Sequence, residues 1–172
     1  MVSNDRFLAV PIWPFSPQLL LIFFLSPIAF IFVNHLLMYS IGTLGLYKIK
    51  KEFEIEFVSF LLLFFIFFMN GHLIGKMTAY GPGRLGYYLI PWLILFLFRI
   101  CIYERKNKDS LFDRDALLLG CVLGMIFWQG SMHVFTAFTT FFVYWGFFNL
   151  DKLRRLICIL GVALTLNSMR IL

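Results

Sequence analysis

Charged residues are scarce in this chain. They make up 14% of its 172 residues, against roughly 25% in soluble globular domains. Hydrophobic residues reach 61% and aromatic residues 20%, so the chain has too little polar surface to cover a soluble core. Apolar runs such as 19–32, 57–69 and 85–98 are typical of helices that lie in a bilayer. The composition therefore predicts an integral membrane protein.

The patterns of several common sites are also absent from the sequence. Its three cysteines, Cys101, Cys121 and Cys158, form no C-x-x-C or Cys/His cluster at ligand spacing, so we expect no disulfide, no metal site and no cofactor. We expect no secretory signal peptide, because residues 1–17 lack a basic region followed by an apolar core. The net charge of +6 is spread in short clusters, which argues against a nucleic-acid partner.

The apolar runs predict an all-α fold, a polytopic transmembrane helical bundle that forms a single domain over 1–172. A helix needs about 20 residues to cross a hydrocarbon layer roughly 30 Å thick. We therefore expect about six membrane segments after an outer interfacial tail at 1–17. Their expected bounds are 18–41, 54–71, 86–103, 116–128, 133–149 and 155–171.

The fourth expected segment, 116–128, is unusually short. Its 13 residues make only about 20 Å of helix. We expect it to form a short hairpin pair with 133–149 around the polar turn 129–133. Backbone without helical hydrogen bonds is tolerated at membrane depth only where it is buried in protein or lines a wet cavity, so this turn is a candidate wall of a site.

The basic residues divide unequally between the connecting loops. The first, third and fifth loops carry Lys48, Lys50, Lys51, Arg105, Lys106, Lys108, Arg114, Lys152, Arg154 and Arg155. By the positive-inside rule these loops face the cytoplasm. We therefore expect an extracytoplasmic N-terminus and a place in the cell (plasma) membrane, with the lipid bilayer as a partner. The loop after Asn70 and the 129–133 turn are expected on the outer side.

Polar and basic side chains gather on that expected outer side. Lysine offers a phosphate a point charge and arginine offers a bidentate fork, so we predict a site for the phosphate of a lipid. Its predicted members are His72, Lys76, Arg84, Gln129, His133 and Arg170. Simpler interpretations stay open: the cations can contact lipid headgroups only, the histidines can be capping or interfacial, and the glutamine can bond to a neighbouring helix.

Four stretches resemble the polytopic membrane glycosyltransferases of the GT-C type, in particular an uncharacterised bacterial and archaeal group related to them. The family's helix, basic turn and helix ending in Asn-Gly resemble the stretch "SIGTLGLYKIKKEFEIEFVSFLLLFFIFFMNGHL". Its outer loop and next helix start are similar to "YGPGRLGYYLIPW". "FWQGSMHVFTAFTTFFVYWGFF" resembles its Gly-x-x-His stretch, and "LNSMRIL" its Arg-containing helix end. The resemblance implies a hexosyltransferase-like enzyme that uses a polyprenyl- or dolichyl-phosphate-linked sugar at the extracytoplasmic face.

The chain departs from this family in its carboxylates. The family's catalytic carboxylate lies in a large first outer loop, whereas the only acid expected outside in this chain is Asp5. Glycosyl transfer needs a base or a metal-holding carboxylate near the acceptor. We therefore assign no catalytic residue, and expect a fragment or shortened member of the family that is not active alone.

Two other functions are compatible with the sequence. One is a small transporter or channel-like subunit, in which the short segment 116–128 and Gln129 line a pathway. The other is a non-catalytic scaffold that pairs with other membrane helices. Gly120 and Gly124 have the small-xxx-small spacing that such pairing uses.

Overall fold

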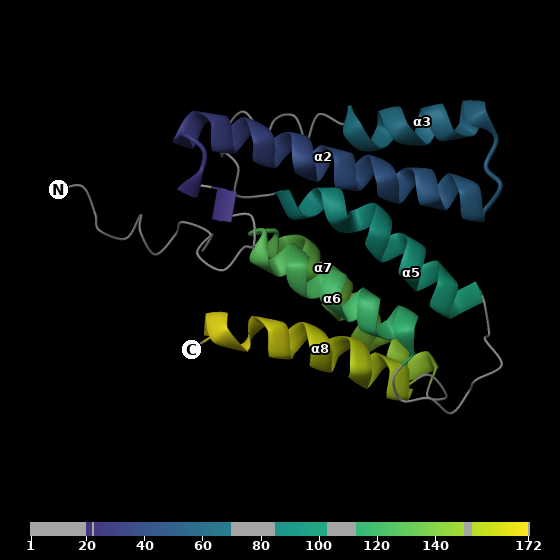
Figure 1. The fold of residues 1–172 in the computed structure, drawn as a ribbon. Coiled ribbons are helices and arrows are strands. Elements are labelled where there is room, and N and C mark those ends of the chain that lie inside the picture. The colour runs from purple at the N-terminus through teal and green to yellow at the C-terminus, as the bar shows by residue number, and fades with distance from the viewer. Residues whose placement is uncertain (1–19, 22, 70–84, 103–112, 150–152, 172) are drawn as a thin grey trace.

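The computed structural model describes residues 20–21, 23–69, 85–102, 113–149 and 153–171. Within these ranges lie six α-helices and the 3-10 helix η3: α2 (Pro27–Glu52), α3 (Phe57–Phe68), η3 (Leu85–Leu89), α5 (Ile90–Ile102), α6 (Arg114–Trp128), α7 (Met132–Phe148) and α8 (Leu153–Ile171). The all-α class is thereby confirmed. Successive helices run in alternating directions, so their ends gather at two ends of a bundle (Figure 1).

The first long helix, α2, begins later than the expected segment 18–41. Ser26 precedes it with an extended backbone, and its hydroxyl oxygen accepts a hydrogen bond of 3.4 Å from the Ala29 N–H. Pro27 follows at the start of the helix, where its missing N–H costs nothing. This Ser-Pro cap, and not the beginning of the apolar run, fixes where the helix starts.

The same helix also continues past its expected end at residue 41. It ends at Glu52, and Glu54 then adopts a φ of 51°, in the left-handed region where a helix cannot continue. Three lysines that we expected in a loop therefore belong to the last two turns of α2, where cations complement the helix dipole. They are Lys48, Lys50 and Lys51.

Among the remaining helices, only α3 differs much from expectation: it has 12 residues, whereas 54–71 was expected. The bounds of the others lie within two residues of those expected: η3 together with α5, α6, α7 and α8. Among the described helices only Ile28–Glu52 is long and apolar enough to cross a membrane. A 17-residue helix such as α7 is about 26 Å long. By length and composition, one described helix can therefore cross a membrane. The expectation of about six membrane segments stays a prediction.

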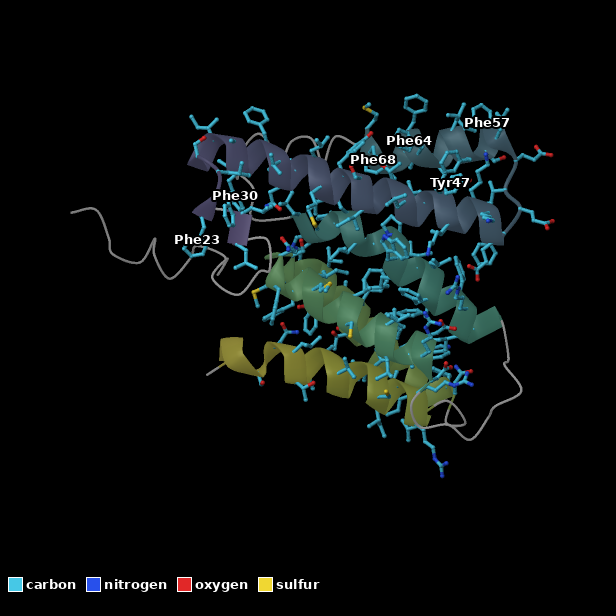
Figure 2. All side chains as sticks on the ribbon, in the orientation of Figure 1. Phe23, Phe30, Tyr47, Phe57, Phe64 and Phe68 are labelled. Atoms are coloured by element: carbon cyan, nitrogen blue, oxygen red, sulfur yellow. The ribbon has the colours of Figure 1, made fainter. Side chains whose placement is uncertain are left out.

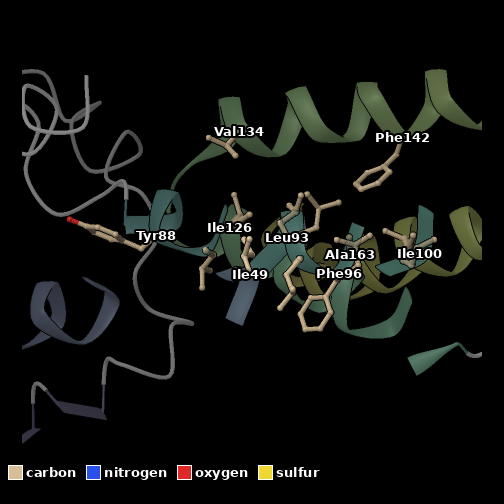
Figure 3. Close-up of a cluster of buried hydrophobic side chains, with 14 of the residues drawn as sticks. Ile49, Tyr88, Leu93, Phe96, Ile100, Ile126, Val134, Phe142 and Ala163 are labelled. Atoms are coloured by element: carbon tan, nitrogen blue, oxygen red, sulfur yellow. The ribbon is translucent and has the colours of Figure 1, made fainter. Parts of the chain in front are cut away.

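α6 is the central helix of the bundle. It packs against α5 on one side and α8 on the other, and α7 also contacts it, while α2 packs against α5 and η3. Buried apolar side chains such as Leu93, Ile126 and Phe142 fill the space between these helices (Figure 3). Large apolar side chains such as Phe57 point outward from α2 and α3 (Figure 2). The bundle is thus apolar both inside and on much of its outer surface.

Two glycines allow α6 and α8 to approach closely. A Cβ atom added at Gly120 would lie 2.8 Å from the Ile159 carbonyl oxygen and 2.9 Å from the Val162 Cβ. A Cβ at Gly124 would lie 3.0 Å from a methyl carbon of Leu166. These glycines therefore face α8 of the same chain. This corrects the expectation that their spacing serves pairing with helices of another protein, because α8 already covers that face.

The glycine contact predicts opposite effects of the same substitution in α6 and α8. Gly120→Ala should destabilise the chain by about 1–3 kcal/mol, because the added methyl group meets backbone that cannot yield. Gly161→Ala is the matched control, since no described residue lies within 4 Å of its Cβ position, and alanine there should stabilise the helix by about 0.5–1 kcal/mol. Thermal unfolding followed by circular dichroism measures both. An equal rise in the midpoint for both variants would contradict the α6–α8 contact.

Candidate functional site

The two ends of the bundle differ in chemistry. One end, which we call the turn end, carries the connection 129–131 between α6 and α7, the start of η3 and the end of α8 (Figure 1). The other, which we call the ion-pair end, carries the ends of α2 and α5 and the beginnings of α6 and α8. The three predicted phosphate-binding residues within the described ranges, Gln129, His133 and Arg170, all lie at the turn end.

The turn 129–131 forms because α6 ends in a regular hydrogen-bonded cap. The Gln129 N–H donates to the Met125 carbonyl oxygen at 2.9 Å, and the Gly130 N–H donates to that of Phe127 at 3.0 Å. Gly130 has a φ of 78°, a left-handed conformation that glycine adopts without strain. The chain therefore reverses within three residues and begins α7 beside the end of α6.

A histidine and a tyrosine from different helices meet beside this turn. His133 lies in the first turn of α7, is exposed, and its Nε2 is 3.0 Å from the Tyr87 hydroxyl, with the ring centres 5.4 Å apart. Gly86 makes this approach possible, because a Cβ there would lie 2.8 Å from both the Ile126 carbonyl oxygen and the Ser131 hydroxyl. The imidazole is thus held in place at the surface of the turn end.

Buried polar groups accompany this pair. The Trp128 indole N–H donates to the Leu166 carbonyl oxygen at 3.1 Å and ties the turn to α8. Asn167 is 1% exposed and donates to the Ala163 carbonyl oxygen, while its Oδ1 has no hydrogen-bond partner among the described residues. The hydroxyl of Ser131 is likewise buried and unpartnered within the described ranges. Buried oxygen atoms without a hydrogen-bond partner are rare in folded proteins. The turn end therefore holds hydrogen-bonding groups that the packing of the described residues does not use.

The predicted phosphate-binding residues fall into three groups. Gln129 caps α6 and His133 opens α7, so the structure brings these two together at the turn end. Arg170 lies in the last turn of α8, at the same end of the bundle, and its side chain is outside what the structure describes. The other three lie in the segment 70–84, outside the described residues: His72, Lys76 and Arg84.

The opposite end holds every acidic residue within the described ranges: Glu52, Glu54, Glu56, Asp113 and Asp115. Arg99 of α5 donates to both carboxylate oxygens of Glu52, with its Nε 2.7 Å from Oε1 and its terminal nitrogen 2.5 Å from Oε2. Another terminal nitrogen of Arg99 lies 3.7 Å from Asp115. Arg155 of α8 lies 3.6 Å from Asp113. These ion pairs join the ends of α2, α5, α6 and α8, and we call the cluster of Glu52, Arg99, Asp115, Asp113 and Arg155 the clasp.

These contacts between side chains of different helices had little local signal in the sequence. Tyr87 and His133 are 46 residues apart, and Glu52 and Arg99 are 47 residues apart. The usable signal was Arg99 itself, because an arginine inside the apolar run 90–102 requires a carboxylate or carbonyl partner. No sequence pattern identified Tyr87 as the hydrogen-bond partner of His133.

Among the described residues, no three His, Cys, Asp or Glu side chains gather as a group that could hold a metal ion.

Comparisons of the chain with protein-family models, with curated proteins and with solved structures find no match. The resemblance to GT-C glycosyltransferases therefore stays a prediction, based on the stretches quoted above.

The bidentate pair at the ion-pair end predicts strong coupling between two distant residues. In a double-mutant cycle of Glu52→Gln and Arg99→Gln, we expect a coupling of about 0.5–3 kcal/mol, because either substitution alone breaks the bidentate contact and leaves the charge of the other residue partly buried. The measurement is the free energy of unfolding in denaturant. Lys51→Gln, at an exposed residue beside Glu52, is the control and should show no coupling to Arg99→Gln. Additive effects of the first two substitutions would rule out the clasp.

Proposed function

We propose that this chain is an integral membrane helical bundle that binds the phosphate of a lipid-linked sugar at its turn end, in the manner of a GT-C-like glycosyltransferase. The observation that carries this proposal is the separation of polar groups along the bundle. The described acids lie at the ion-pair end, whereas Gln129 and His133 lie at the turn end. Seven of the eight described cations also lie at the ion-pair end. At the turn end, however, an anionic headgroup meets hydrogen-bond donors and no described carboxylate that would repel it.

The outer surface of the bundle supports a place in the bilayer. Large apolar side chains cover the sides of α2, α3 and α7, as illustrated by Phe32 at 73% exposure, Ile66 at 71% and Phe147 at 74%. Exposed apolar surface of this extent marks a membrane or protein contact. Hydrocarbon is the partner that needs no complementary shape, so it accounts for exposure on several helices at once.

The lysines at the end of α2 support an orientation. The Lys48 ammonium lies 5.0 Å from the centre of the Trp92 ring, and that of Lys50 lies 5.0 Å from the centre of the Phe57 ring. Lysines that run along apolar surface and end over aromatic rings are typical of a membrane–water interface. Since cations are retained on the cytoplasmic side, the ion-pair end faces the cytoplasm and the turn end faces outward.

The described carboxylates lie far from the turn end, where the transfer reaction would take place. A catalytic base must contact the acceptor hydroxyl directly or through one water molecule, and each described carboxylate lies at the opposite end of the bundle. The described residues accordingly bind and orient the lipid carrier, and a carboxylate base for the acceptor would have to lie outside them.

Labelling from one side of the membrane tests the orientation. In a chain whose three cysteines are replaced by alanine, Met132→Cys at the turn end should react with a membrane-impermeant maleimide on intact cells. Glu56→Cys at the ion-pair end should react only after permeabilisation. Both positions are exposed in the structure, so labelling of both after permeabilisation is the control. Equal labelling of the two positions on intact cells would refute the alternating membrane arrangement.

Matched charge removals test the phosphate site. The double variant Lys76→Ala/Arg84→Ala should weaken binding of a polyprenyl phosphate in lipid nanodiscs by about a hundredfold or more, since each of the two lost charge-assisted contacts costs about 1.5–3 kcal/mol. Lys51→Ala/Arg154→Ala removes the same charge from exposed residues at the ion-pair end and should leave binding unchanged. His133→Ala should give a smaller loss. If both double variants weaken binding equally, the effect is one of net charge and the phosphate site is not at the turn end.

A further inference from the structure

A cavity of about 370 Å³ lies at the turn end between α2, η3 and α6. Its size falls within the range of about 300–1,000 Å³ that is usual for small-molecule sites. α2 contributes Leu37, Met38 and Ile41 to its wall, and α6 contributes Met125 and Trp128. The cavity is therefore framed by the helix that is long enough to cross a membrane and by the helix that leads into the turn.

The cavity extends from the core to the apolar outer surface. Met38 is 1% exposed and Leu89 is 6% exposed, so this part of the wall belongs to the core. Leu37 and Met125 also line the cavity, yet they are 36% and 47% exposed. Exposed apolar side chains of two helices thus also line the cavity, on the kind of surface that the proposed function places in hydrocarbon.

The lining suits a hydrocarbon chain and excludes a charged group. Among the described residues, no lysine, arginine, aspartate or glutamate lines the cavity, and the Trp128 indole N–H already donates to Leu166. Gln129 is the one described lining side chain with an amide, and it belongs to the turn itself. A phosphate or a sugar would lose its hydration here without gaining adequate partners, whereas buried methylene groups gain free energy in proportion to their area.

The polar and apolar features lie next to each other at this end. Trp128 and Gln129 line the cavity, and His133 of α7 follows Gln129 by four residues and contacts Tyr87 of η3. A ligand with its chain in the cavity thus has its head beside the turn. We propose that the cavity binds the hydrocarbon chain of a membrane lipid, which enters between Leu37 and Met125; this rests on the proposed function, whose lipid carrier supplies such a chain.

A photoreactive chain tests the cavity. The probe is a citronellyl chain that carries a diazirine, used both as the free alcohol and as the phosphate, with the full chain in nanodiscs. Illumination should place adducts on Met38, Met125 or Trp128. Leu37→Trp should lower labelling by both probes about tenfold, because the indole displaces methylene groups from the cavity. Leu36→Trp is the matched control, at an exposed neighbour on the same helix that does not line the cavity, and should change nothing.

The two probes separate failure of the cavity from failure of the phosphate site. Equal binding of alcohol and phosphate, with adducts in the cavity, upholds the cavity and refutes the phosphate contact. Adducts only outside the cavity, no adducts, or equal losses in Leu36→Trp and Leu37→Trp overturn the cavity proposal. If Leu37→Trp does not fold, Met125→Phe takes its place, with Met132→Phe as the control at an exposed methionine that does not line the cavity.

Discussion

The close contact of α6 with α8 is the constraint on which the rest of the structure depends. Gly120 allows the backbone of α8 to lie against α6, and two further contacts hold the same pair of helices at either end. At the turn end Trp128 donates to Leu166, and at the ion-pair end Arg155 approaches Asp113. Because α6 also packs on α5 and α7, both ends of the bundle take their positions from this one pairing.

A second pair of glycines explains why a cavity remains between α2 and α6. A Cβ at Gly42 would lie 3.0 Å from the Tyr88 carbonyl oxygen, and one at Gly45 would lie 2.9 Å from the Trp92 ring. The Trp92 indole N–H also donates to the Ile41 carbonyl oxygen at 2.8 Å. α2 is thereby held against η3 and α5, the same elements on which α6 packs. Because η3 contacts both α2 and α6, these two helices are held in place without packing directly against each other along their whole length, and a cavity can remain between them.

The sequence predicted what depends on local pattern and missed what depends on caps and distant pairs. The later helices follow from their apolar runs, but the start of α2 depends on the Ser26 cap, and apolar composition does not reveal it. Gln129 and His133 were predicted because polar residues interrupt a long apolar stretch. Tyr87 was missed because its contact with His133 requires the fold to bring η3 and α7 together.

The length of α6 sets a limit on the chemistry of the bundle. Asp115 and Gln129 lie near its two ends, 14 residues apart, which corresponds to roughly 20 Å along the helix. A carboxylate at that distance cannot take a proton from a hydroxyl group at the turn end, because proton transfer requires heavy atoms about 3 Å apart or one bridging water. The clasp at the ion-pair end therefore stabilises the bundle without taking part in a reaction at the turn end. A carboxylate that acts on a hydroxyl group at the turn end would therefore have to come from outside the described residues.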